Sequence, residues 1–372
     1  MDAAAAKALI DTLDAPPRLD IMGHVRAAAA EGMHPFELIR DMLRVIRGPG
    51  RLTPHEYFYY RLYDQTLARD EARRYVGKRA QNAFHAACND LRWYAVAHDK
   101  ALFYAAAAGY GLPVPRTRAV YAPGVRTFGA ETIRTPEALA AFLSNAACYP
   151  MFVKPIDGIY SLGVLSLAAL EHGRICLTTG EAASLEAVVG FVTGFGGAGF
   201  LLQDRLEPHP ALRQAFGATL PTVRFLVLLA PDGAAVESAV LKIPSARNPA
   251  DNYWRAGNLL GALDRAGTLM RAMTGIGAAV RDVATHPDTG ATLNGLAVPD
   301  WERARELCQR AATVFPGIRT QSWDVAITDA GPVLLEVNFG GDLNLHQLAH
   351  RRGALTPSYA EHVKRCGYRR LR

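Results

Sequence analysis

The first hundred residues repeat apolar positions every three or four residues, which is the spacing of an amphipathic helix. The segments 34–48 and 53–84 both follow this pattern, and the second carries many aromatic side chains. Thr53 and Pro54 suit the N-cap and the first turn of a helix. We expect the aromatic rings to pack between helices, because base stacking normally uses a basic strand platform that this segment lacks.

Beyond residue 99 the pattern changes to short apolar strands separated by proline and glycine. One helix is expected to end at Gly109 or Gly111, and an amphipathic helix is expected within 299–316. Strands are expected in the segments 151–167, which holds a glycine-bearing loop, 201–208, and the two hairpins 221–243 and 321–338. Because strands and helices mix without regular βαβ alternation, the predicted fold class is α+β.

The hairpin at 321–338 carries acidic residues inside apolar strands. Its loop is expected to be the three residues 329–331, because a final glycine suits a type I turn followed by a left-handed bulge. That register places Thr328 opposite Pro332 and, counting back, Asp324 opposite Glu336.

Asp324, Glu336 and Asn338 are therefore expected on one face, since residues two apart in a strand point the same way. Two facing carboxylates repel each other unless one is protonated or a cation lies between them. Carboxylate and amide oxygens suit Mg²⁺. The alternative is a structural hydrogen-bond network with one acid neutral, but three oxygen donors in an apolar hairpin exceed that need.

The segment 154–163, KPIDGIYSLG, is a candidate phosphate loop. Lys154 lies in an apolar strand and needs an anion, and Gly158, Ser161 and Gly163 let backbone N–H groups approach one. The segment matches neither the Walker A pattern nor GxGxxG, so a plain surface turn remains the alternative.

The hairpin at 221–243 adds two cations, Arg224 and Lys242, near the same end when counted from its Pro-Asp-Gly turn. A guanidinium can grip phosphate oxygens through two parallel hydrogen bonds. Each of the two could instead be an ordinary surface cation on a strand.

The bulk composition is that of a globular protein, with half of the 372 residues hydrophobic and a fifth charged. No apolar run reaches membrane-spanning length. The first twenty residues lack a basic leader followed by an apolar core, so no secretory signal is expected, and their alanine content predicts a short helix. The net charge of +6 fits nucleic acid or an acidic substrate such as ATP. The basic tail 362–372 is expected to be solvated.

Five cysteines occur without a CxxC pair, at Cys88, Cys148, Cys176, Cys308 and Cys366. A dispersed, odd set favours reduced thiols in the cytoplasm and argues against a zinc site or a disulfide framework.

The order of these segments resembles the ATP-grasp superfamily: a lysine in DKALFYAAAAGYGLPVP, then FVKPIDGIYSLGV, LLQDRL, an aspartate and LLEVN. More narrowly, TVRFLVL, ADNYWRAGNL and WDVAIT with GPVLLEVN and GDL resemble the sugar-transfer-associated ATP-grasp group, over about residues 95–350. The resemblance implies two α+β subdomains that clamp ATP, beside an extra helical region. The expected divisions are a helical region 1–98, a subdomain with the glycine loop 99–200, a subdomain with the magnesium site 201–350 and a basic tail 351–372.

The resemblance also implies roles for single residues. Lys100 and Lys154 would hold the α- and β-phosphates of ATP, under a mobile loop formed by Gly158, Ser161 and Gly163. The hinge strand that lines adenine through backbone groups would be Gln203, Asp204, Arg205 and Leu206.

Further roles concern the sugar and the reacting phosphate. Glu207 would reach the ribose, with His209 as a rival. Arg224 and Lys242 would contact the γ-phosphate as catalytic residues. The magnesium ligands would be Asp324, Glu336 and Asn338.

Some positions depart from the pattern. D-alanine ligase relatives carry an arginine where this chain has Ser322, and Arg319 or Arg255 are candidate substitutes. The glycines at 340 and 341 could offer N–H donors to an oxyanion. Asp342 could simply cap the helix that follows.

These features favour an ATP-dependent ligase with ATP and Mg²⁺ that joins a carboxylate to an amine through an acyl phosphate. A small-molecule kinase that phosphorylates a hydroxyl is the second reading, and Ser322 keeps it open. A non-enzymatic basic module that binds RNA or an acidic partner is the third. Nucleic-acid and membrane partners are not expected.

Overall fold

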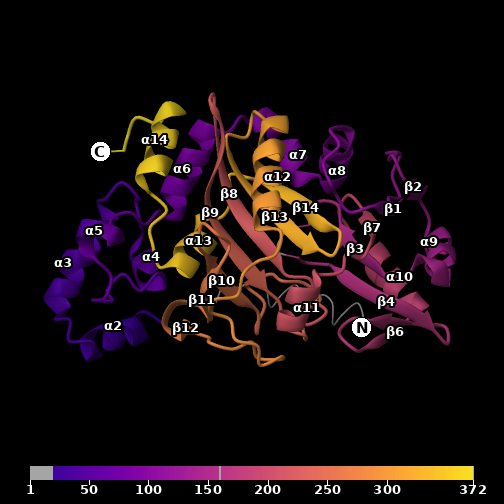
Figure 1. Cartoon of the computed structure of the whole chain (residues 1–372), viewed down its shortest axis with the longest axis horizontal. Helices are drawn as coiled ribbons and strands as arrows, with labels where there is room; N and C mark the ends of the chain where they lie inside the picture. The colour runs from indigo at the N-terminus through magenta and orange to yellow at the C-terminus, as the bar shows by residue number, and fades with distance from the viewer. Residues whose placement is uncertain (1–19, 159–160, 372) are drawn as a thin grey trace.

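The computed structural model describes residues 20–158 and 161–371. The short helix expected in the first twenty residues falls on residues 1–19, which lie outside the described ranges. Positions 159 and 160 of the candidate phosphate loop also lie outside them. Two seven-stranded sheets form the body of the molecule, and the helices of residues 21–88 and the last described helix lie at the same end of it (Figure 1). Within the described ranges, no helix is both long and apolar enough to cross a membrane.

The first sheet has the strand order β2-β1-β7-β3-β4-β5-β6. Its strands are β1 Thr117–Tyr121, β2 Glu131–Ile133, β3 Met151–Pro155, β4 Leu165–Glu171, β5 Arg174–Leu177, β6 Ala182–Ser184 and β7 Phe200–Asp204. The helices α9 Pro136–Leu143 and α10 Leu185–Gly194 pack against it through a shared apolar cluster. Because β7 pairs with β1 and β3, the expected division at residue 200 falls inside a strand of this sheet.

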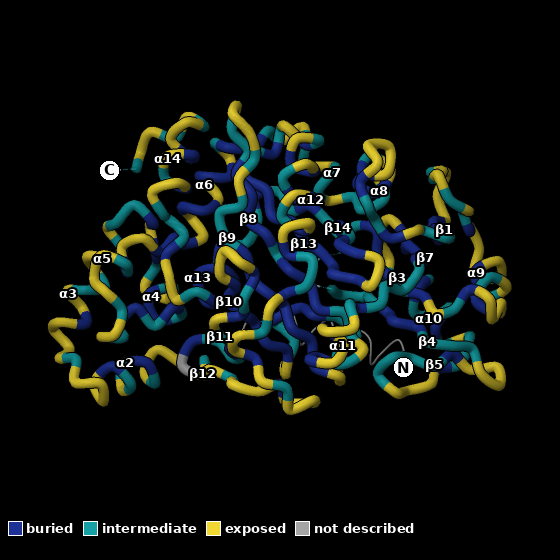
Figure 2. Tube along the Cα trace, viewed as in Figure 1, coloured by how far each residue is buried: buried dark blue, intermediate teal, exposed yellow. Residues whose placement is uncertain are grey.

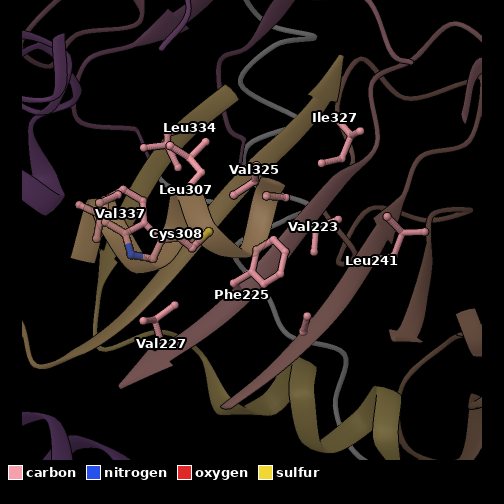
Figure 3. Close-up of a cluster of buried hydrophobic side chains, with 14 of the residues drawn as sticks. Val223, Phe225, Val227, Leu241, Leu307, Cys308, Val325, Ile327, Leu334 and Val337 are labelled. Atoms are coloured by element: carbon pink, nitrogen blue, oxygen red, sulfur yellow. The ribbon is translucent and has the colours of Figure 1, made fainter. Parts of the chain in front are cut away.

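The second sheet has the order β12-β11-β10-β9-β8-β13-β14. Its strands are β8 Thr222–Ala230, β9 Gly233–Ile243, β10 Leu259–Leu263, β11 Leu269–Thr274, β12 Arg281–Asp282, β13 Thr320–Thr328 and β14 Gly331–Phe339. The predicted helix near the carboxyl end is confirmed as α12 Trp301–Val314. Figure 3 shows Leu307 and Cys308 of α12 over Phe225, Val325 and Val337, so this helix closes the main core.

The other helices lie around these sheets. They are α2 Ile21–Ala30, α3 Pro35–Ile46, α4 Pro54–Tyr59, α5 Arg69–Ala72, α6 Lys78–Cys88, α7 Tyr94–His98, α8 Lys100–Gly109, α11 Pro210–Phe216, α13 Leu343–His350 and α14 Pro357–Arg365. The ends of α8 and α3 agree with the sequence prediction. The yellow exposed surface in Figure 2 lies mainly on outer helices and loops, and the central strands are dark blue.

The continuous helical pattern of 53–84 is divided into α4, α5 and α6. After α4 the backbone N–H of Leu62 bonds to Tyr57 O and that of Arg61 to Phe58 O, which is the Schellman stop signal. Arg61 takes the left-handed conformation there, with φ of 52°, although glycine is the usual residue. The aromatic rings of this segment are buried, as expected from packing, in a cluster shared with strands β9, β10 and β11.

The basic tail is a docked helix and not a solvated one. One side of α14 is buried through Tyr359, His362 and Val363, and it contacts α6 and β8. Beyond the helix, Cys366, Tyr368 and Leu371 are partly buried against the same apolar cluster, and the basic side chains between them are exposed.

The β13–β14 hairpin has a two-residue loop, and the predicted three-residue loop is wrong. Thr328 pairs with Gly331, and Ile327 pairs with Pro332. Asp324 nevertheless faces Glu336, because a bulge between Asp324 and Val325 shifts the register by one residue. The error at the turn and the bulge in the strand cancel, so the carboxylates meet as expected.

Replacing Thr53 by alanine should lower the free energy of unfolding by about 1 kcal/mol, because α4 would lose its N-cap. The Thr53 Oγ1 accepts from Glu56 N at 3.2 Å, and Glu56 Oε2 accepts from Thr53 N at 2.7 Å. Urea unfolding measures the loss, and Thr53→Ser, which keeps the oxygen, should stay close to the wild type. Equal stability of all three proteins would contradict this account.

Candidate functional site

A cleft of about 450 Å³ opens between the two sheets, and the N-terminal helices form one wall. A smaller pocket of about 90 Å³ adjoins it. Lys154, Thr222, Asp251 and Leu335 line both spaces, so the two are continuous. Most of the residues singled out from sequence lie around this double cavity, although they come from both halves of the chain.

Asp324 is the centre of the site. Its two carboxylate oxygens accept from Nε and Nη2 of Arg224 at 2.6 Å each, and Oδ2 accepts from Lys242 Nζ at 3.0 Å. The three residues lie on the adjacent strands β13, β8 and β9, and the pairing of these strands brings them together. Burial alone would raise the pKa of Asp324, but the charges of Arg224 and Lys242 outweigh it and hold that pKa far below its usual range.

Asp251 is a fourth buried charge, which the sequence reasoning did not assign. Lys242 Nζ lies 3.5 Å from Asp251 Oδ1, and Thr222 Oγ1 donates to Asp251 Oδ2. Burial raises the pKa of Asp251 despite the opposing charge of Lys242. Asp251 belongs to the segment ADNYWRAGNL, which is part of the resemblance and could have drawn attention to it. Nothing in the sequence pattern indicated that it would lie beside Lys242.

Glu336 and Asn338 face the cleft beside this cluster. The Glu336 side chain is 30% exposed, and its carboxylate oxygens lie 3.8 Å from Lys100 Nζ and from Arg224 Nη2. The Asn338 Nδ2 donates to Ser322 O at 3.3 Å. These two hard oxygen donors are held only loosely, so with Asp324 they fit a magnesium ion in chemistry and placement.

Two lysines approach the cleft from the first half of the chain. Lys100, at the start of α8, donates from Nζ to Gly158 O at 2.6 Å. Lys154 in β3 is buried and donates to Tyr104 OH at 2.6 Å, and that hydroxyl donates to Leu335 O at 2.7 Å. Burial, and then the charge of Lys100, lowers the pKa of Lys154 to about 7. The lysine is therefore poised for an anion that would restore its charge.

The glycine-bearing loop is held to the second half of the chain by Arg255, whose Nη2 donates to Ser161 O at 2.8 Å. Ser161 and Gly163 have φ of 55° and 73°. A side chain at Gly163 would meet the ring of Phe195 at 2.6 Å, so glycine is needed there for packing as well as conformation. Gly158 and Ser161 line the cleft, and Gly163 lies behind them.

The predicted hinge residues line the smaller pocket, together with apolar side chains. Gln203, Asp204, Arg205 and Leu206 all contribute to its wall, and Phe152 and Leu220 add apolar surface. Asp204 is paired with Arg118. A narrow apolar slot beside strand β7 suits a flat aromatic ring.

The structure does not bring Glu207 into either pocket. Its carboxylate is engaged by the guanidinium groups of Arg205 and Arg213. The rival His209 instead caps α11, because its Nδ1 accepts from Ala211 N at 3.2 Å. Neither side chain lines either of the two pockets, so the ribose contact expected from the sequence has no support in their positions.

The positions that depart from the family pattern are also placed. Ser322 is fully buried, and Arg319 holds backbone carbonyls at the ends of α6 and α14, so Arg319 cannot replace the missing arginine. Gly340 packs on the ring of His85, where a Cβ would lie 2.4 Å from Cγ. Asp342 caps α13, as its alternative reading expected.

The N-terminal helices supply a wall of the cleft that sequence reasoning missed. Lys78, Gln81, Asn82 and His85 of α6 contribute, with Tyr94 and His98 of α7. The His85 Nε2 atom is buried without a hydrogen-bond partner among the described residues, and burial, then Lys78, lowers the pKa of His85 to about 4. Helical periodicity predicted these helices but could not show which polar face would meet the sheets.

A family model described as sugar-transfer associated ATP-grasp matches residues 79–365. No curated protein matches the chain.

Solved structures show distant similarity. The ATP-grasp ligase PsnB complexed with minimal precursor has 15% identity and a TM-score of 0.38, over 74% of this chain and 63% of that one. The D-alanine-D-alanine ligase from Coxiella burnetii has 11% identity and a TM-score of 0.43, over 75% and 60%. A biotin carboxylase from Campylobacter jejuni has 10% identity and a TM-score of 0.44, over 76% and 49%. This chain therefore spans about half to three-fifths of the length of these chains.

Replacing Asp324 by asparagine should lower the free energy of unfolding by about 3–5 kcal/mol, because Arg224 and Lys242 would remain buried without their anion. Replacing Glu336 by glutamine should cost less than about 1 kcal/mol, since its ion pairs are long and partly exposed. Urea unfolding of both variants measures the difference. Similar losses in the two proteins would contradict a central role for Asp324.

Proposed function

Because this chain belongs to the sugar-transfer associated ATP-grasp family, we propose that it is an ATP-dependent ligase that joins a carboxylate to an amine. The observation that carries the proposal is the convergence of basic and acidic side chains in one cleft. Lys100 and Lys154 reach it from one half of the chain, and Arg224 and Lys242 reach it from the other, around Asp324. Such a set of cations is suited to a polyphosphate.

The nucleotide would lie across the two connected spaces. Adenine would occupy the slot beside Gln203 and Leu206, and the phosphates would extend past Lys154 towards Lys100. The loop containing Ser161 would lie over the phosphates. The hydrogen bond from Arg255 to Ser161 O joins this loop directly to the second half of the chain.

Asp324, Glu336 and Asn338 would hold magnesium. When bound, the ion neutralises charge on the phosphate oxygens. Glu336 and Asn338 are available as ligands because their polar atoms make only long contacts. Asp324 contributes a carboxylate that Arg224 and Lys242 keep ionised.

The proposed reaction has two steps. A substrate carboxylate oxygen attacks the γ-phosphorus, the bond from phosphorus to the leaving ADP oxygen breaks, and an acyl phosphate forms. An amine then attacks the acyl carbon, phosphate leaves, and the amine proton is released. Arg224 and Lys242 would orient the γ-phosphate and stabilise the charge that develops on it. The side chains of α6 and α7 would contact the acceptor.

A kinase that phosphorylates a hydroxyl is the second candidate, and Ser322 is the observation that favours it. This buried serine stands where D-alanine ligase relatives carry an arginine, and Arg319 is committed to backbone carbonyls elsewhere. A kinase would need no amine, and its product would be a stable phosphoester.

Release of ADP should require ATP, Mg²⁺ and an acceptor from a pool of carboxylates, amines and alcohols. Mass detection of products then separates the candidates, because the ligase needs both substrate classes and the kinase needs only a hydroxyl.

Glu336→Gln should reduce turnover on the order of 100-fold, as expected for loss of one preorganised charge. Glu302→Gln, on the exposed side of α12, is the matched control. Nucleotide binding that is unaffected by Glu336→Gln and no ADP release with any acceptor would overturn the proposal.

Nucleotide binding at pH 8 should be accompanied by uptake of up to about one proton, because Lys154 is mostly neutral before binding and charged beside a phosphate. The complex holds the extra proton, so affinity should fall as the pH rises above about 7. Calorimetry in two buffers of different ionisation enthalpy measures the uptake. Lys154→Arg, which is always charged, should abolish it, and unchanged uptake in that variant would assign the proton to another group.

A further inference from the structure

A cluster of two thiols and an imidazole lies where α6 meets α14. Cys88 is the last residue of α6, His362 lies in the last turn of α14, and Cys366 is the C-cap of α14. The ligand atoms of these three residues all lie within 4.8 Å of one another. The scattered cysteines of the sequence argued against a zinc site, but the fold brings two of them together with a histidine.

Local structure explains two of the three placements. His362 and Cys366 are four residues apart, so their side chains point to the same side of a helix. Cys88 arrives from a distant part of the chain, and the docking of α14 on α6 supplies it. A motif search finds only closely spaced ligands, so it cannot detect a site built across 274 residues of separation.

The spacing of the cluster fits a tetrahedral zinc ion. With Zn–S and Zn–N bonds of about 2.3 and 2.05 Å, two ligands of such a site lie about 3.6 Å apart for S and N, and about 3.8 Å apart for S and S. The Cys366 Sγ atom lies 3.7 Å from His362 Nε2. The three ligand atoms therefore need only small side-chain adjustments to surround one ion.

A guanidinium group lies beside the cluster. The Arg319 guanidinium donates to Cys88 O at 2.8 Å and to Cys366 O at 3.4 Å, which places a positive charge between the two helix ends. The hydrogen bond between the two thiols lowers the pKa of Cys366 to about 5 and raises the pKa of Cys88 well above its usual value, so Cys88 holds its proton until an ion displaces it. Thr320 Oγ1 lies 3.1 Å from His362 Nε2, so an ion bound to this nitrogen would replace the contact with Thr320.

We propose that Cys88, His362 and Cys366 bind one thiophilic divalent cation, Zn²⁺, which fastens α14 to the end of α6. Binding replaces the thiol protons with bonds to the ion, and three protein ligands leave the fourth position to water. The site lies on different residues from the cleft, so it is independent of the nucleotide proposal. It would also steady α6, whose other face lines the cleft.

The test uses the full-length chain without an affinity tag, reduced and stripped of metal with EDTA. After Zn²⁺ is added and excess is removed by gel filtration, atomic emission should find about one zinc per chain. Cys366→Ser should abolish this binding, and Cys176→Ser, a thiol outside the cluster, should retain it. In the wild type, Co²⁺ should give the near-ultraviolet charge-transfer band of sulfur ligands, and the band should be absent from Cys366→Ser.

Two results would overturn the proposal. One is equal zinc binding by the wild type and Cys366→Ser, which would place the ion elsewhere. The other is a reduced wild type that binds no Co²⁺ and that, after air oxidation, yields a peptide joining Cys88 to Cys366 in mass spectrometry, which would show that these two thiols form a disulfide. Cys366 is half-buried, and serine is close to cysteine in size, so the variant should fold normally. A circular dichroism spectrum equal to that of the wild type would show that the variant has lost metal ligation and not its fold.

Discussion

The buried ion cluster of Asp324 with Arg224 and Lys242 is the constraint on which the cleft depends. Removing charges from water is costly unless each has a close partner. Here the three charges occupy neighbouring strands of one sheet, so strand order and register decide whether they meet. A slip of one residue in any of these strands would turn its charge to the opposite face, among the apolar residues under α12. The ion cluster and the apolar core therefore specify the same register from opposite sides of the sheet.

This arrangement explains why the cleft has charges of both signs. Asp324 and Asp251 balance the cations of the second sheet in the free protein. Lys100 and Lys154 have weaker local compensation, since the nearest carboxylate to Lys100 is Glu336 at 3.8 Å. An anionic ligand would therefore gain most from the lysines of the first half, and Arg224 and Lys242 would be positioned before it arrives. Preorganisation of this kind is what electrostatic catalysis requires.

The N-terminal helices have two structural roles, because some of their residues pack in the core and others line the cleft. Their aromatic rings are buried against strands of the second sheet, and α6 and α7 lie beside the cleft, where their polar residues face the charged residues of the sheets. The same helix α6 carries His85 on the cleft side and Cys88 at the contact with α14. One helix thus joins the wall of the cleft to the carboxyl-terminal helix, and its placement matters to both.

The ATP-grasp fold implied by the resemblance is confirmed, because local motifs carried it. LLEVN with an upstream aspartate, and a lysine in an apolar strand, carry the resemblance, and these buried polar residues need partners whatever the surrounding sequence. The hairpin register was harder. The predicted turn was one residue too long, and only an unpredicted bulge restored the pairing of Asp324 with Glu336. The ribose contact expected of Glu207 found no support, because neighbouring arginines engage that side chain.

The sequence by itself determined the periodic helices, the apolar strands and the polar residues that interrupt them, because these patterns depend on neighbours a few positions away. Only the tertiary structure decided that Asp251 would join Lys242, that His85 would meet Gly340, and that Cys88 would meet Cys366. Each of these contacts joins distant segments, and their positions are set by the packing of whole sheets and helices. The chemical type of each side chain is known from the sequence. Which distant side chains come into contact depends on how the apolar faces of the helices and sheets pack.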